Sequence, residues 1–315
     1  MIKYKELDPM IAIRKAVNGI ILGAVGIIAV IPSQAVSETV SPLPGQRVVM
    51  VTGSTGGLGR ETALALARSG DHVIIHGRNV ERAQEVLREI EQDGNGSARF
   101  YQADLASLEE TRDLANSILA DYERLDVLVN NAGVFLGEDK PRRVTGDGYE
   151  LHFQVNYLAG YVLSAMLLPL LEESAPSRIV HVASGQRPLD FDDLGFEKGY
   201  TGFDAYLRSK NAQIMMTYAT ADALAERDIT TNALFPSALM NTAMVIEAGF
   251  EPQSSVETGR DALLQLINDD VGTGHYYDIF EIGEAIPQAS DPEAQQALME
   301  ASADMTSVRF PVYSP

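Results

Sequence analysis

Cysteine is absent from this 315-residue chain, which excludes disulfide bonds, thiolate metal sites and a cysteine nucleophile. The five histidines show no His-Glu-x-x-His sequence or other paired-ligand spacing, so we expect no metal and interpret His152 and His181 as packing or surface residues. Basic residues are scarce: 24 Lys and Arg against 44 Asp and Glu give a formal charge of -20. Nucleic acid is therefore not an expected partner, because phosphate binding needs clustered basic side chains.

The chain also lacks internal repeats and, after residue 50, any Pro-, Gly- or Ser-rich linker, which favours one large domain. Its N-terminus differs: basic residues up to Lys15 precede an apolar run at 17–31, followed by small residues up to Ala35. The run is shorter than the about 20 residues of a full membrane span. Residues 1–35 are therefore expected to be a signal peptide or an N-terminal membrane anchor, followed by a linker at 36–46.

Both interpretations of residues 1–35 place the basic end of the chain in the cytoplasm. The protein is therefore expected to be exported or membrane-associated. The sequence leaves the side of the membrane open, and a domain that faces the cytoplasm is the alternative.

From residue 47 to residue 315, short apolar runs alternate with longer amphipathic segments. The expected strands are 48–51, 72–76, 99–102, 125–129, 178–182 and 229–234. The expected helices are 61–69, 80–92, 107–122, 156–171 and one from Tyr206 to about residue 226. This order predicts an α/β fold, a Rossmann-type doubly wound parallel sheet with helices on both faces, in a single domain. Such sheets bind ligands at the carboxyl ends of their strands.

A glycine-rich turn, Thr52-Gly53-Ser54-Thr55-Gly56-Gly57-Leu58-Gly59, follows the first expected strand. Glycine at this point lets the backbone approach a pyrophosphate, and the amides at the start of the next helix face the phosphate charge. The turn therefore predicts a nucleotide site.

Tyr206 and Lys210 lie four residues apart on an expected helix, which places both side chains on one face. An ammonium group there stabilises a tyrosinate and lowers the tyrosine pKa from its usual value of about 10. Such a tyrosine is a general acid and base. The spacing alone is common on solvated helices. The catalytic interpretation is favoured because three other motifs accompany the pair. These are the glycine turn, Asn130-Asn131-Ala132-Gly133 after the fourth strand, and Ser184 after the fifth.

In this order and spacing the motifs resemble the short-chain dehydrogenase/reductase family over about residues 47–310. The matching pieces are Thr52-Gly53-x-x-x-Gly57-x-Gly59, Asp104-Leu105, Asn130-Asn131-Ala132-Gly133, Asn156, Ser184 and Tyr206-x-x-x-Lys210. Segments 191–194, 197–200, 291–294 and 302–306 are similar to the retinol-dehydrogenase-like group of that family.

The resemblance implies an NAD(P)-dependent oxidoreductase that acts on an alcohol or carbonyl substrate. Tyr206 would exchange a proton with the substrate oxygen, Lys210 would lower its pKa and bind the nicotinamide ribose, and Ser184 would hold the substrate oxygen. Asn156 would steady a water in the proton relay. The implied cofactor contacts are Gly53, Thr55, Gly57, Leu58, Gly59, Arg78, Asp104, Leu105, Asn130, Ala132, Gly133, Tyr206, Lys210 and Pro236.

The second strand ends in His76-Gly77-Arg78, without an acid that would accept the ribose hydroxyls of NAD. Arg78, with Arg82 in support, therefore favours NADP(H) over NAD(H). Two positions depart from the family pattern: Ser237 replaces glycine after Pro236, and the expected threonine is displaced to residue 242. The segment 236–259 is rich in apolar residues. In the family that this chain resembles, the region closes over the substrate, so the resemblance implies a lipophilic substrate. An amphipathic helix packed on the core is the alternative interpretation of the segment.

Two other functions share this fold. A non-catalytic nucleotide-binding sensor or scaffold is disfavoured because Ser184, Tyr206 and Lys210 are all present. An epimerase-like enzyme fits the alternative spacing Gly53-x-x-Gly56-x-x-Gly59 but is disfavoured by Asn130 to Gly133. The expected partner is a small molecule, and a homo-oligomer is compatible with the sequence.

Overall fold

The computed structural model describes residues 40–138 and 140–311. The expected signal peptide or anchor at 1–35 and the first part of the expected linker lie outside the described residues. The last linker residues contact the domain, because Gln46 Nε2 donates a hydrogen bond to Gly70 O at 2.9 Å. Among the described residues, no helix combines the length and the apolar character that crossing a membrane requires.

Within the described residues, one sheet has eight strands in the order β3-β2-β1-β4-β5-β6-β7-β8. The first seven pair in parallel, and β8 is antiparallel to β7. The strands are β1 Val48–Val51, β2 His72–Gly77, β3 Ser97–Gln102, β4 Val127–Asn130, β5 Ser177–Val182, β6 Ile229–Phe235, β7 His275–Asp278 and β8 Glu281–Ile282. The Rossmann-type fold is confirmed.

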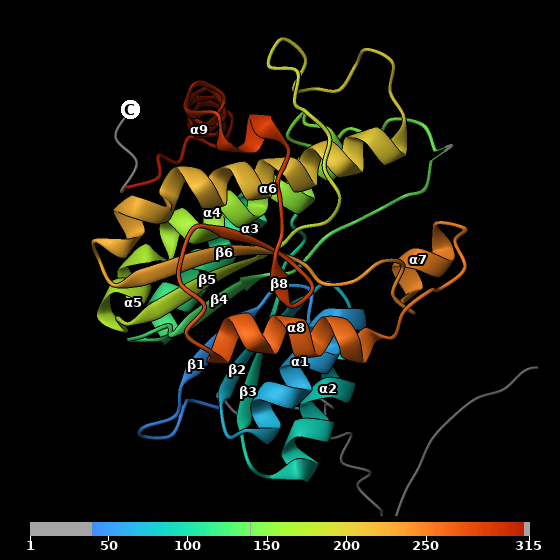
Figure 1. Ribbon diagram of the computed structural model, residues 1–315. Coiled ribbons are helices and arrows are strands. Elements are labelled where there is room, and N and C mark those ends of the chain that lie inside the picture. Colours follow the sequence, from blue (N-terminus) through green and yellow to red (C-terminus); the bar gives the residue numbers. More distant parts are fainter. Residues whose placement is uncertain (1–39, 139, 312–315) are drawn as a thin grey trace, which may run out of the picture. The chain divides into compact units, whose positions relative to one another are not determined.

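Helices cover both faces of the sheet (Figure 1). They are α1 Gly57–Arg68, α2 Val80–Asp93, α3 Leu108–Asp121, α4 Ala159–Met166, α5 Leu168–Glu173, α6 Gly202–Ala225, α7 Ala243–Glu247, α8 Val256–Asn268 and α9 Pro292–Thr306. A π-helical turn at Phe153–Leu158 leads into α4, and a 3₁₀ turn at Pro287–Ser290 leads into α9.

The core lies on both sides of the sheet because side chains alternate along each strand. In β1, Val48 and Met50 join one apolar cluster, which includes residues of α3, α4 and α6. Val49 and Val51 join the other, which includes residues of α1, α2 and α8. Both faces of β1 are fully buried, as the uninterrupted apolar run predicted.

The strand order changes direction between β1 and β4. The connections from β1 to α1 and from β4 onward therefore leave the sheet on opposite sides, which opens a crevice at the carboxyl ends of these two strands. The glycine turn follows β1, and the loop from Asn131 follows β4. The fold thus brings the two sequence motifs to one edge of the sheet.

Candidate active site

The glycine turn between β1 and α1 needs glycine for conformation and for packing. Gly53 has φ +66° and Gly57 has φ +53°, in the left-handed region that favours glycine. Gly59 is enclosed: a Cβ atom there would lie 2.5 Å from Gly53 O and 2.5 Å from the Nδ2 atom of Asn131. Any side chain at Gly59 would therefore push the turn away from the loop after β4.

The N-terminus of α1 is suited to bind an anion. Its N-cap residue, Gly56, is extended and places no side-chain cap on the first turn, which also contains no acidic residue. The amide groups of this turn have no partner within the helix, and the helix dipole is positive there. These features fit the pyrophosphate of a dinucleotide cofactor.

Thr52 and Asn131 join the glycine turn to the loop after β4. Thr52 Oγ1 accepts hydrogen bonds from the backbone N–H groups of Asn131 and Ala132, both at 2.9 Å. In return, Asn131 Nδ2 donates to Thr52 O at 2.7 Å. The sequence suggested Asn130 as a cofactor contact, but it is the side chain of Asn131 that contacts the glycine turn.

Asn130 is buried inside the sheet layer. Its Nδ2 atom donates to Ser164 Oγ at 2.9 Å and lies 3.3 Å from His181 Nδ1. The side chain of Asn130 thus holds β4 to α4 and β5. Gly133, further along the loop, lies beside Asn156 and Lys210: a Cβ atom there would be 3.3 Å from Asn156 Oδ1 and 3.5 Å from Lys210 Nζ.

At the far side of the crevice, Arg78 follows β2 and Asp104 follows β3. The Arg78 Nη1 atom lies 3.5 Å from Asp104 Oδ2, and the two side chains are 66% and 40% exposed. The next residue, Leu105, is buried. A cation and a carboxylate therefore lie at the edge where the sequence predicted contacts to the adenosine half of the cofactor.

Tyr206 and Lys210 both lie on α6, as their spacing predicted. The Lys210 Nζ atom is 5.7 Å from the centre of the Tyr206 ring. It donates hydrogen bonds to Val182 O at 2.6 Å and to Gln213 Oε1 at 3.1 Å. Ser184 lies just beyond β5, with its side chain close enough to Tyr206 to lower the pKa of that tyrosine. The three predicted residues therefore meet at one end of β5.

The pKa values of Tyr206 and Lys210 differ from the expectation that Lys210 lowers the pKa of Tyr206. Burial raises the pKa of Tyr206, and the hydrogen bond with Ser184 opposes that shift. Burial also lowers the pKa of Lys210 to about 7, because desolvation disfavours the ammonium form. In this arrangement Lys210 gives its hydrogen bonds to Val182 and Gln213. The expected lowering of the Tyr206 pKa by Lys210 is not seen here.

Asn156 lies in the π-helical turn before α4, a feature that is frequent at functional sites. Its Oδ1 atom accepts from Val134 N at 2.7 Å, and its Nδ2 atom donates to Val134 O at 3.1 Å. Nδ2 also donates to Ser209 Oγ at 2.9 Å, and Ser209 Oγ donates to Tyr206 O at 2.6 Å. Asn156 therefore connects the loop after β4 to the backbone of the tyrosine helix.

Phe135 packs against Tyr206, and two further aromatic rings pack against Phe135. The ring of Phe135 lies 4.9 Å from that of Tyr206, 6.1 Å from that of Phe203 and 5.9 Å from that of Phe250, between centroids. These rings come from the loop after β4, the start of α6 and the segment after α7. We call Phe135, Phe203 and Phe250 the aromatic cluster. It provides an apolar surface next to the predicted acid.

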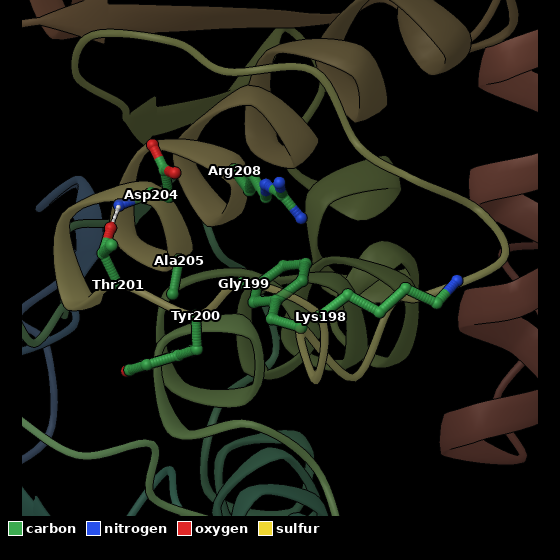
Figure 2. A pocket seen from close by; sticks show the side chains of 8 residues that line it. Lys198, Gly199, Tyr200, Thr201, Asp204, Ala205 and Arg208 are labelled. Atoms are coloured by element: carbon green, nitrogen blue, oxygen red, sulfur yellow. Dashed lines mark hydrogen bonds between the residues drawn. The ribbon is translucent and has the colours of Figure 1, made fainter.

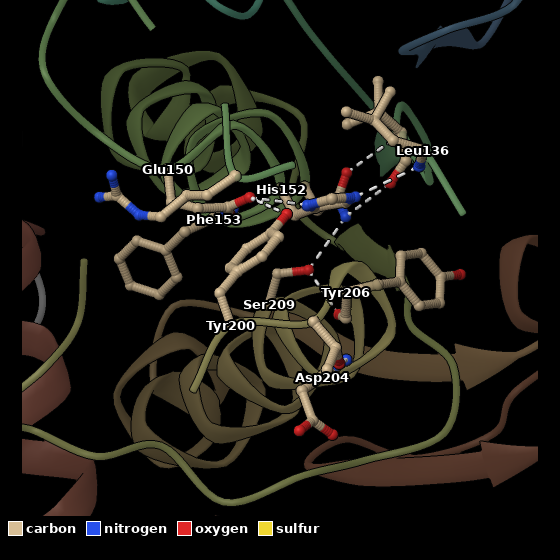
Figure 3. A network of polar contacts seen from close by, with 12 residues as sticks. Leu136, Glu150, His152, Phe153, Tyr200, Asp204, Tyr206 and Ser209 are labelled. Carbon is tan, nitrogen blue, oxygen red and sulfur yellow. Dashed lines mark hydrogen bonds and ion pairs between the residues drawn. The ribbon is translucent and has the colours of Figure 1, made fainter. Parts of the chain in front are cut away.

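A buried polar pair, His152 and Glu150, holds the loop that carries Phe135 of this cluster. His152 Nδ1 donates to Glu150 Oε1 at 2.7 Å, and His152 Nε2 accepts from Leu136 N at 3.3 Å. Figure 3 shows His152 joined to Glu150 on one side and to Leu136 on the other. Glu150 also accepts hydrogen bonds from Tyr200 Oη and Phe153 N. The pair thus anchors the loop that carries Phe135.

A separate, shallow pocket lies beside the first turns of α6 (Figure 2). Asp204 and Arg208 line it, each two residues from Tyr206. Residues two apart on a helix point about 200° apart. The pocket is therefore on the opposite side of α6 from the tyrosine.

Other predicted residues lie at the rim of the crevice. Pro236 packs against Gly259 of α8, and Thr242 packs against Gly57, where a Cβ atom would lie 3.3 Å from Thr242 Cγ2. The displaced threonine therefore reaches the glycine turn. Leu58 is buried in the core cluster under α1. Among the described residues, no group of His, Asp and Glu is arranged to hold a metal ion.

Comparisons with known proteins agree with this geometry. The family model for short chain dehydrogenases matches residues 47–251. Retinol dehydrogenase 13 of Mus musculus is 32% identical over 296 residues, which cover 87% of each chain. Polyprenol dehydrogenase of Homo sapiens is 36% identical over 249 residues, 75% of this chain and 74% of that protein.

Solved structures show the same similarity. A short chain dehydrogenase of Shigella flexneri complexed with NADP has a TM-score of 0.62 and 30% identity, covering 75% of this chain and 97% of the other. One from Escherichia coli complexed with NADPH has a TM-score of 0.61 and 31% identity, with the same coverage.

The fold and the similarities define an NAD(P)-dependent alcohol/carbonyl oxidoreductase that transfers hydride to or from a small-molecule substrate. The chain belongs to the short-chain dehydrogenase/reductase family and, within it, is retinol-dehydrogenase-like.

Proposed function

We propose that this protein uses NADP(H) to interconvert a lipophilic alcohol and its carbonyl compound, with Tyr206 as the acid and base. The observation that carries the proposal is the convergence of Ser184, Tyr206 and Lys210 beside the glycine turn and the open N-terminus of α1. A pure nucleotide sensor has no use for the serine and the tyrosine. The same argument disfavours a scaffold.

The chemistry follows from the positions of these groups. A bound nicotinamide supplies or accepts the hydride at the substrate carbon. In the reductive direction, Tyr206 Oη gives its proton to the carbonyl oxygen, and in the oxidative direction it takes the proton of the alcohol. Ser184 donates a hydrogen bond to the same oxygen, where negative charge develops. The ammonium of Lys210, 5.7 Å from the centre of the Tyr206 ring, stabilises the tyrosinate through its charge.

The preference for NADP(H) is supported by the end of β2. Arg78 is the cation at this edge, and its exposed guanidinium is free to pair with a phosphate in place of Asp104. The acid that NAD would require at residue 77 would displace the side chain of Thr55, since a Cβ atom there would lie 2.7 Å from both Cγ2 and Oγ1 of Thr55. The site therefore favours the phosphorylated cofactor.

The lipophilic substrate is supported by the aromatic cluster. Phe135 provides apolar surface next to Tyr206, and Phe203 and Phe250 extend that surface from Phe135. Phe250 comes from the segment that the sequence suggested for substrate contact. Such surface gains about 25 cal/mol for each Å² that a substrate removes from water.

For the N-terminus we propose that residues 1–35 direct the domain to the membrane or across it. Fractionation of cells followed by N-terminal sequencing of the mature protein distinguishes cleavage from anchoring. A soluble mature protein that begins at residue 1 contradicts both forms of this proposal.

The central experiment is Tyr206→Phe. We expect oxidation of NADPH with carbonyl substrates to fall at least 100-fold, because the proton donor is lost, while NADPH affinity stays within about three-fold. Tyr218→Phe is the matched control: this tyrosine lies on the same helix, about 18 Å further along, and should keep full activity. Turnover that persists in Tyr206→Phe rules out the assigned acid.

A further inference from the structure

His76 is a buried residue near the carboxyl end of β2 that contacts the glycine turn directly. Its side chain is only 2% exposed. Gly53 N donates a hydrogen bond to His76 Nδ1 at 3.1 Å, and His76 Nε2 lies 3.2 Å from Ala103 O. The imidazole thus bridges the start of the glycine turn and the end of β3.

The two partners determine the state of the ring. A carbonyl oxygen only accepts, so Nε2 carries the proton that is shared with Ala103. A backbone N–H only donates, so Nδ1 presents its lone pair to Gly53. The ring is therefore neutral with one defined tautomer. Burial lowers the pKa of His76 to about 4, which agrees with a neutral ring near pH 7.

The backbone of His76 holds the next residue of the turn as well. Ser54 N donates to His76 O at 2.9 Å, and His76 N donates to Ser54 Oγ at 3.0 Å. Gly53 and Ser54 are therefore both tied to one residue of β2. Gly53 is also the residue with φ +66°, where the chain turns from β1 toward α1.

We propose that His76 is a positioning residue for the cofactor: its Nδ1 atom holds Gly53 in the conformation that directs the following amides at the pyrophosphate. A free Gly53 has many conformations, since glycine populates positive and negative φ about equally. The hydrogen bond from Gly53 N to the ring removes that freedom before the cofactor arrives, which lowers the entropy cost of binding. This inference rests on the proposed use of NADP(H).

Two substitutions separate the two hydrogen bonds. The Oδ1 atom of asparagine reaches the place of Nδ1, so His76→Asn keeps the acceptor for Gly53 and loses the bond to Ala103. The Nε2 atom of glutamine reaches the place of the ring Nε2, so His76→Gln keeps the donor to Ala103 and loses the acceptor for Gly53. Each variant loses one hydrogen bond, so we expect similar falls in melting temperature without cofactor.

The measurement is the dissociation constant of NADPH, from titration of the cofactor fluorescence. We expect His76→Gln to raise it about ten-fold and His76→Asn to leave it within about three-fold of wild type. His72→Gln is the control. His72 lies on the same strand, is also buried, and bonds Ser97 and Tyr122 at the other end of β2. It should lower the melting temperature and leave the dissociation constant unchanged.

Equal dissociation constants for His76→Asn and His76→Gln overturn the inference, and so does a rise in His72→Gln as large as that in His76→Gln. Wild-type protein that binds neither NADPH nor NADH overturns the proposed function first, and this inference with it. The order of the titrations therefore tells the two failures apart.

Discussion

The Nζ atom of Lys210 lies 2.6 Å from the carbonyl oxygen of Val182, the last residue of β5. A lysine ammonium has three donors, and Gln213 takes a second one at 3.1 Å. One donor is left for a ligand. The buried lysine is thus held by the end of β5 and by its own helix. Burial of its ammonium group costs folding free energy.

Lys210→Met should stabilise the protein at pH 7 while it removes activity. Burial lowers the pKa of Lys210 from 10.5 in the unfolded chain to about 7. Folding is therefore penalised as the pH falls from about 10.5 to about 7, because the unfolded state binds the proton more tightly. After the loss of the bond to Val182, we expect a net gain on the order of 2 kcal/mol at pH 7.

Urea denaturation of wild type and Lys210→Met at pH 7 and at pH 10 checks this prediction. The advantage of the variant should shrink toward pH 10, where the wild-type lysine is neutral in a larger fraction of unfolded molecules. An advantage that is independent of pH would show that Lys210 carries no such penalty.

Gly59→Ala should destabilise the fold by about 2 kcal/mol or more, because the new Cβ atom would lie 2.5 Å from the backbone oxygen of Gly53. Gly56→Ala is the control in the same turn: no atom lies within 4 Å of a Cβ there, and the backbone is extended. Denaturant unfolding of both variants is the measurement. Equal losses would contradict the close approach of turn and loop.

Arg78→Ala should raise the Michaelis constant for NADPH about ten-fold or more and change that for NADH by less than two-fold. The reason is that only NADPH carries the phosphate that this guanidinium would bind. Arg227→Ala removes the same charge beside Glu172, remote from the crevice, and should change neither constant. Equal changes for both cofactors in Arg78→Ala would remove this residue from the phosphate site.

Phe250→Ala should reduce kcat/KM more for long apolar alcohols than for short ones, by about five- to thirty-fold. The variant removes a ring of the aromatic cluster, and such burial contributes about 1–2 kcal/mol. Phe280→Ala is the control, since this phenylalanine is 43% exposed and lies between β7 and β8. A loss that is independent of chain length would speak against substrate contact.

The sequence predicted the first six strands to within two residues at each end, because most of them are apolar runs between turn residues. It missed β7, which reads His-Tyr-Tyr-Asp and becomes a strand by pairing with β6. It also joined 156–171 into one helix, whereas the chain forms a π-helical turn, α4 and α5. Pro169 in the first turn of α5 explains the break before α5.

Within the site, local motifs predicted the features formed by residues that are close in sequence. These are the glycine turn and the placement of Tyr206 and Lys210 on one helix face. Tertiary contacts were beyond such motifs. The choice between Asn130 and Asn131 depends on which side chain turns into the sheet at the end of β4. The aromatic cluster joins three segments from residues 135, 203 and 250, which no periodic pattern connects. His76 was likewise noted only as a strand end without an acid.

The close contact between Thr55 and Gly77 constrains how an acidic residue can arise at position 77 during evolution. An acid at residue 77 would place its Cβ atom 2.7 Å from the threonine side chain, so the single change Gly77→Asp distorts the turn before it gains an NAD contact. A smaller residue at 55 removes this contact. The two positions are therefore epistatic: a double-mutant cycle on Thr55→Gly and Gly77→Asp should show strong non-additivity. A lineage that carries this threonine therefore gains an acid at residue 77 more readily after a change at residue 55.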